Sequence, residues 1–301
     1  MAADSMLELH LYSLPNELFV QILSPFTTRE LLSVARVSHR FHALVLRLLH
    51  YRLLLSATVA EYNLILECFH PADRLTEPNV FCKYLGTPGL SDKYEGEGSL
   101  YENVDMAGQL GRLGSLYSVF KPVESEQEAS DTSSDYSSDS EAPAEDSPAV
   151  RRPVTIEEFE NFSQLCVVVN LVKSLAGTGI LLSAVNIEDG VIRLFRDWLK
   201  GQANCLQSPT HHDDFSGSRK SGVLWADQGK NVGLKFRVRE VTTLESNFPV
   251  LMPSAEDSLS SYEIMIDELH IRTPRLLMAV EQSLYEQQSY PKAIVFTTSM
   301  L

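Results

Sequence analysis

The chain has few of the features that mark secreted, nucleic-acid-binding or metal-binding proteins. Its 301 residues include four cysteines, none of which forms a CxxC pair or stands at zinc-ligand spacing from a histidine. This pattern favours reduced thiols in a reducing compartment and predicts no metal site. The chain has 25 Lys and Arg against 40 Asp and Glu, a net charge of −15. Phosphate recognition needs clustered cations, so we expect no nucleic-acid partner.

Signals for membranes and for catalysis are also missing. The N-terminus has no basic stretch followed by an apolar one, so no secretory signal is predicted. The apolar stretch 165–185 contains Lys173 and a Gly-Thr-Gly turn signal, which favours two buried strands joined by a loop over a membrane span. No phosphate loop, nucleophile elbow or HExxH motif is present. We therefore expect no membrane partner, no cofactor, no catalytic residue, and a cytoplasmic or nuclear location.

What is present begins with a helical block at residues 8–56. Its first helix carries an apolar stripe at i, i+4 and i+8, formed by Leu14, Leu18 and Ile22. Thr27 and Glu30 form a capping box for a second helix, and Ser38 can cap a third. A bundle of about fifty residues is near the lower size limit for an independent core. Part of its apolar surface is therefore expected to cover a partner or another domain.

The segment 14–45 resembles the F-box pattern without a gap. The matching elements are Leu-Pro-x-Glu-Leu at 14–18, Leu-Leu at 31–32 and Val-Ser-x-Arg-Phe at 37–41, while Pro-Phe at 25–26 replaces the more usual aromatic-Leu pair. This resemblance implies a non-catalytic subunit that binds the Skp-type adaptor of a cullin ubiquitin ligase. By resemblance, the residues that line the adaptor contact are Leu14, Pro15, Leu18, Ile22, Leu31, Val37 and Phe41.

Residues 57–301 show recurring strand-like stretches separated by turn signals, typical of an antiparallel sandwich or barrel. In one stretch, 232–239, apolar and basic residues alternate as in a strand with one buried face. Asp189-Gly190 predicts a two-residue hairpin turn. A change of phase near Asp267 predicts a β-bulge or a strand break. The predicted fold class is α+β, with a three-helix F-box followed by a larger β-sandwich-like domain.

An acidic, Ser-rich stretch interrupts this β region. Residues 124–148 contain nine Asp or Glu and no Lys or Arg, and almost no apolar side chains. Such a segment cannot offset the entropy of ordering, so residues 122–152 are predicted to form a disordered insert. Thr132 and Ser138 fit acidophilic kinase sites, with a plain solvated loop as the alternative. The layout of an F-box, a β-rich region and an acidic insert resembles F-box proteins common in filamentous fungi.

Two hypotheses of function follow. In the first, the chain is a substrate-recruiting subunit of an SCF-type ligase, which binds the Skp-type adaptor and cullin complex through the F-box and an unidentified protein target through the β domain. In the second, the β domain is a sandwich that binds a carbohydrate or a peptide, and the F-box serves only for assembly.

Overall fold

The computed structural model describes residues 14–74, 78–123, 150–157, 159–175, 180–207, 222–241 and 260–289. Helices form at both ends of the described chain and twice between the strands. Their bounds are α1 Asn16–Leu23, α2 Thr28–Val34, α3 His39–Ala57, α4 Met106–Gly114, α5 Arg196–Gln207 and α6 Thr273–Ser289. The strands are β1 Asn63–Phe69, β2 Val80–Gly86, β3 Tyr117–Val123, β4 Val150–Ile156, β5 Phe162–Ser174, β6 Leu181–Phe195, β7 Val223–Trp225, β8 Val232–Val241 and β9 Ser260–Arg272.

The first three helices begin where the sequence predicts. The Thr27 side chain accepts from the Glu30 backbone, and the Glu30 carboxylate accepts from the Thr27 N–H at 2.8 Å, so both halves of the capping box are present. The Ser38 hydroxyl accepts from the N–H of Phe41 at 3.3 Å at the start of α3. These bonds satisfy N–H groups that a helix start leaves unpaired. Both predicted caps are confirmed.

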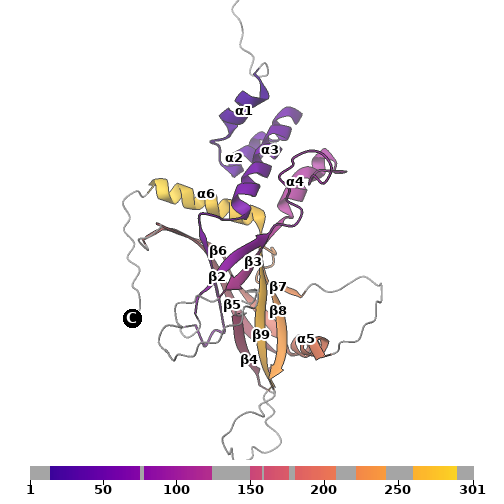
Figure 1. Ribbon diagram of the computed structural model, residues 1–301, viewed down its shortest axis with the longest axis vertical. Helices are drawn as coiled ribbons and strands as arrows, with labels where there is room; N and C mark the ends of the chain where they lie inside the picture. Colours follow the sequence, from indigo (N-terminus) through magenta and orange to yellow (C-terminus); the bar gives the residue numbers. More distant parts are fainter. Residues whose placement is uncertain are drawn as a thin grey trace, which may run out of the picture.

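The strands form one antiparallel sheet that curls almost into a barrel. Within the described residues it has nine strands in the order β6-β5-β1-β2-β3-β9-β8-β7, and β4 also pairs with β9. β3 and β4 share one edge of β9, because β3 pairs with Leu269–Arg272 and β4 with Ser260–Ile266. Figure 1 shows the bundle at one end of this sheet. The predicted α+β class, with helices before a sandwich-like sheet, is confirmed.

The predicted insert 122–152 is too long at both ends. Residues 122–123 belong to β3 and residues 150–152 to β4, and Val150 is buried in the sheet core. The acidic composition of the neighbouring run obscured the short strand ends on both sides of it, so the sequence assigned these residues to the insert. Residues 124–149, and with them Thr132 and Ser138, lie outside the described residues.

The predicted hairpin at Asp189-Gly190 is wrong. β6 continues through this point and pairs with β5 along its length, with a register shift that leaves Ile187 without an opposite residue. A bulge and a two-residue turn both shift the apolar alternation by one position, so the pattern fits either. Gly190 serves a different purpose. A methyl group there would lie 2.5 Å from the carbonyl oxygen of Ala226, where β6 approaches the turn after β7.

Three other strand predictions are confirmed. Leu234, Phe236 and Val238 of β8 are buried, as the alternation predicts. Opposite them, Lys235 pairs with Glu268 and Phe236 with Ile266, so Asp267 is the extra residue of a bulge in β9. The two strands joined by a loop within 165–185 are β5 and β6. A strand predicted at 293–297 lies outside the described residues.

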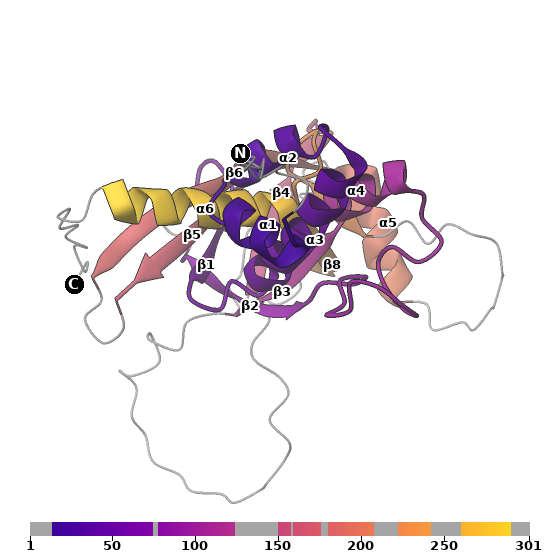
Figure 2. The same cartoon turned by 90° about the horizontal axis from the view of Figure 1, so that it is seen from above.

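Helix α6 joins the bundle to the sheet. The sequence did not predict this helix, nor α4 and α5. Helix α6 lies crosswise between the bundle and the sheet (Figure 1), and Figure 2 shows the bundle above it. Leu276 and Ala279 belong to the sheet core, whereas Leu277 belongs to the bundle core. A helix that is buried on two sides does not show a single apolar stripe opposite a polar face, which is the pattern that identifies a surface helix in a sequence.

A polar cluster fixes α6 to the bundle. The Glu281 carboxylate accepts from the Thr28 hydroxyl at 2.6 Å and from the Arg52 guanidinium at 2.9 Å. Arg52 also donates to the backbone carbonyls of Ser24 and Phe26 in the α1–α2 connection. Charged hydrogen bonds among half-buried groups are among the stronger polar contacts in proteins. This cluster therefore links α2, α3 and α6 at one point.

Candidate functional site

The bundle exposes apolar side chains along its first helix. On α1, Phe19 and Leu23 point into the core, while Leu18 and Ile22 are 43 % and 47 % exposed. Val37, in the turn before α3, is 65 % exposed. The apolar stripe predicted in this helix therefore faces solvent. Small bundles that expose aligned apolar side chains commonly use them to bind another protein.

The other predicted contact residues differ in exposure. Pro15 is exposed and Leu14 is half-buried at the start of α1. Leu31 and Phe41 are buried, and the Phe41 ring meets the Phe19 ring edge-on at 5.3 Å between centroids. In this structure the last two face the bundle core, so they support the exposed stripe from beneath.

Some exposed apolar residues of the bundle were not among the predicted contacts, and two of them lie on or next to its first two helices. Phe26 follows α1 and Leu32 lies on α2, and both are more than one third exposed. The exposure of Leu32 could have been inferred from its position next to Leu31. Adjacent residues on a helix point about 100° apart, so one of them faces outward when the other is buried.

Arg40 holds the first helix in place. Its guanidinium donates to the Asn16 side chain at 3.0 Å and to the carbonyl of Leu14. It also lies over the Phe19 ring, with 4.7 Å between its Cζ and the ring centroid. These contacts connect α3 to the start of α1, and they set the direction in which Leu18 points.

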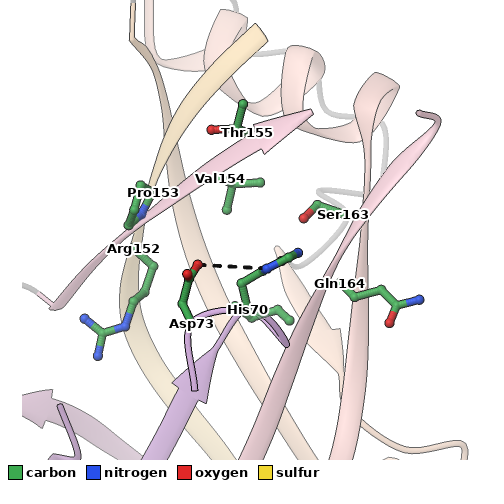
Figure 3. A pocket seen from close by; sticks show the side chains of 9 residues that line it. His70, Asp73, Arg152, Pro153, Val154, Thr155, Ser163 and Gln164 are labelled. Atoms are coloured by element: carbon green, nitrogen blue, oxygen red, sulfur yellow. Dashed lines mark ion pairs between the residues drawn. The ribbon is translucent and has the colours of Figure 1, made fainter. Parts of the chain in front are cut away.

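The sheet carries a small polar cavity, shown in Figure 3. It has a volume of about 160 Å³ and is lined by the β1–β2 connection, β4 and β5. His70 Nδ1 lies 3.9 Å from the Asp73 carboxylate. Arg152 donates to the carbonyls of Cys68 and Pro78, so its guanidinium holds the neighbouring backbone. Thr155 and Ser163 contribute hydroxyl-bearing side chains to the lining of this small cavity.

A larger open groove lies between the two edge strands of the sheet. It has a volume of about 680 Å³ and lies between the end of β6 and the β7–β8 turn. Trp225 supplies an aromatic surface, and its ring is tilted against the Tyr117 ring with 5.2 Å between the centroids. Arg193, Asp227 and Gln228 add polar groups to the lining. Aromatic faces with a few polar groups are typical of sites that bind small polar ligands.

Metal and thiol chemistry find no support among the described residues. No group of three or more His, Cys, Asp or Glu side chains comes together there as a metal site. Burial, and then the neighbouring Cys68, raise the pKa of the Cys82 thiol, which keeps it protonated. Within the same residues, no helix combines the length and the apolar character that crossing a bilayer requires.

Comparisons with known proteins agree with the geometry of the bundle. No curated protein and no solved structure matches this chain. One protein-family model, described as F-box-like, matches residues 11–56, the part of the chain that holds α1, α2 and α3. F-box proteins are generally non-catalytic adaptors, and an F-box implies binding to a Skp-type adaptor in an SCF complex. The F-box-like domain at residues 11–56 supports the identification of this chain as an F-box protein.

Proposed function

We propose that the chain is the substrate-recruiting subunit of an SCF-type cullin ubiquitin ligase, acting in the cytoplasm, the nucleus or both. The observation that carries the proposal is the exposed apolar stripe of Leu18 and Ile22 on an F-box-like bundle. Exposed apolar side chains held on a fixed helix provide the area that a partner buries on binding. Leu14, Pro15 and Val37 extend this surface at its ends.

In this proposal residues 8–56 form the docking half and residues 57–301 the target-binding half, as in F-box proteins of the fungal layout. The mechanism is proximity, since holding a target beside the ubiquitin-charged enzyme raises its effective concentration. The cluster around Glu281 supports this role, because it ties the target-binding half to the docking half through α6. Phosphorylation at Thr132 and Ser138 is proposed as a means of regulating the receptor.

Adaptor binding is the first test. We expect the double variant Leu18→Ala/Ile22→Ala to lower the affinity for a purified Skp-type adaptor by at least about tenfold, because central apolar contacts carry most of the binding energy of an interface. Isothermal titration calorimetry measures this effect. The control is Leu55→Ala, which removes a still more exposed leucine, 61 % exposed, from the far end of α3.

Two outcomes separate the possibilities. A loss with Leu18→Ala/Ile22→Ala but not with Leu55→Ala, in variants that keep the wild-type unfolding temperature, supports docking through α1. Undiminished affinity in the α1 variant would show that the adaptor binds elsewhere, and a wild-type chain that does not bind the adaptor would contradict the proposal.

The groove beside Trp225 favours a second candidate function, a ligand-binding module for which the bundle serves only assembly. The aromatic face and the neighbouring polar groups fit a sugar ring or a short peptide. A glycan and peptide array probed with the full chain tests this function. Binding that is lost in Trp225→Ala, with adaptor affinity unchanged, supports it, and an array without signal contradicts it.

A further inference from the structure

The outward faces of β2 and β3 carry the same pattern of side chains. On each strand a lysine stands between two apolar residues, and the intervening residues point into the sheet core. The outward residues are Phe81, Lys83 and Leu85 on β2, and Val119, Lys121 and Val123 on β3. Phe81 and Leu85 are 44 % and 55 % exposed. The alternation of a β-strand brings each set onto one face.

The register aligns the two patterns. Lys83 lies directly opposite Lys121, and Phe81 lies directly opposite Val123. A bulge at Leu85 shifts the register, so that Gly86 is the residue opposite Val119. Like charges at directly opposed positions destabilise an antiparallel pair. The pair of Lys83 and Lys121 therefore does not contribute to the stability of the fold.

Several other cations on the outside of the sheet have acidic partners. Lys235 lies 2.6 Å from Glu268, Arg237 lies 2.7 Å from Asp267, and Lys173 lies 2.9 Å from Glu61. Among the described residues, the side chains of Lys83 and Lys121 form neither a hydrogen bond nor an ion pair. On a chain with a net charge of −15, this is a local excess of positive charge.

We propose that this lysine face, defined as the six outward residues of β2 and β3, binds an acidic extended segment of a partner protein. The partner segment carries an Asp or Glu between apolar residues at alternate positions. Its carboxylate meets both lysines, and its apolar side chains cover Phe81 and Leu85 on one strand and Val119 and Val123 on the other. The role of this face as the target-binding face of the ligase subunit rests on the proposed function. Binding to the face can nevertheless be measured without the adaptor.

The physical basis is charge complementarity at a partly apolar surface. A carboxylate between Lys83 and Lys121 removes the repulsion that their opposed positions create. Exposed ion pairs are individually weak, so the flanking apolar contacts supply part of the affinity and the charges supply the selectivity. Binding is accordingly expected to weaken as salt is added.

The test uses the full chain and a fluorescein-labelled peptide, Thr-Val-Thr-Glu-Thr-Leu-Thr, whose Val, Glu and Leu share one face when it is extended. A matched peptide has Lys in place of Glu. We expect the Glu peptide to bind more tightly than the Lys peptide by about fivefold at low salt, measured by fluorescence anisotropy. The double variant Lys83→Glu/Lys121→Glu should reverse this preference, because it keeps two like charges but changes their sign.

Two further variants guard against structural effects. Lys83→Gln/Lys121→Gln should abolish the preference between the peptides without reversing it. Lys200→Glu, an exposed lysine on α5, should leave the preference unchanged. Equal binding of both peptides to the wild-type chain, or a preference that does not respond to the charge reversal, overturns the proposal.

The other occupant of this face would be the chain's own acidic stretch, residues 124–148. A variant with its nine acidic residues changed to Asn or Gln distinguishes the two. An unchanged peptide preference supports an external partner, whereas a preference seen only in that variant overturns it in favour of the chain's own segment. Adaptor affinity measured on the same proteins separates this result from the docking proposal, because the peptide assay contains no adaptor.

Discussion

The bundle and the sheet solve the problem of burying apolar residues differently. In the sheet, alternate residues along each long strand enter a common core, and the strand partners cover the backbone. In the bundle, one side of α1 is buried and the other exposes Leu18 and Ile22. A small helical unit has too little volume to bury every apolar residue, whereas a curled sheet encloses those on its inner side and leaves others, such as Phe81 and Leu85, exposed on the outside. The exposed side of α1 is the reason why we propose that a partner covers the bundle.

The largest effect is expected where the bundle has its own core. Leu31→Ala should lower the free energy of unfolding by about 2–5 kcal/mol, because Leu31 is fully buried and its loss leaves a cavity. The neighbouring Leu32→Ala should change it by less than about 0.5 kcal/mol, since Leu32 is partly exposed. Urea unfolding measures both. Equal costs would contradict the division of this helix into a buried and an exposed side.

The next effect tests how tightly the sheet closes. Gly190→Ala should cost about 1–3 kcal/mol, because its methyl group would press on the backbone of Ala226. Gly201→Ala is the matched control, because a methyl group meets no atom within 4 Å there. At this exposed position of α5 the change should raise stability by up to about 1 kcal/mol. Thermal unfolding of both variants checks the prediction, and a neutral Gly190→Ala would mean that β6 and the β7–β8 turn separate easily.

A smaller effect tests the link between the two regions. Glu281→Gln should cost about 1–2 kcal/mol, because Arg52 and Thr28 lose a charged acceptor in a half-buried position. Glu286→Gln is the control, because among the described residues the Glu286 carboxylate accepts a hydrogen bond only from Gln282 on the same helix. We expect faster proteolysis of the first variant between bundle and sheet. Identical cleavage patterns for the two variants would show that apolar packing of α6 holds the regions together alone.

The smallest effect concerns pH. Burial alone would raise the pKa of Glu268, but hydrogen bonds from Lys235 and His270, together with their charges, bring it below its ordinary value of 4.5. A carboxylate with a lowered pKa stabilises the fold above the unfolded value, and this contribution is lost as the pH falls through the folded value.

The wild-type protein should therefore be more stable than the Glu268→Gln variant at about pH 6. This difference in stability should shrink towards about pH 3. Urea midpoints at the two pH values measure this. A constant difference would mean that the ion pair on the sheet contributes nothing through its charge.

The sequence predicted most accurately where the cause is local. The capping box of Thr27 and Glu30 depends on residues three apart, and the bulge at Asp267 shows in the phase of a single strand. The hairpin at Asp189-Gly190 failed because a turn and a bulge change the alternation in the same way. Helix α6 was missed because its two buried sides face different cores. The predicted contact residues Leu31 and Phe41 were taken from the resemblance to an F-box, and a sequence pattern does not show which apolar residues a small bundle buries.

The sequence by itself therefore determined the three helices of the bundle, two of them with their caps, the alternating strands and the F-box-like character of the first fifty residues, because helix caps and strand periodicity depend on near neighbours. Only the tertiary structure decided which apolar stripe of α1 remains exposed, that α6 joins bundle and sheet, and that Lys83 faces Lys121. These features depend on contacts between residues far apart in the chain, such as Thr28 and Glu281, and on a strand register that no single segment specifies.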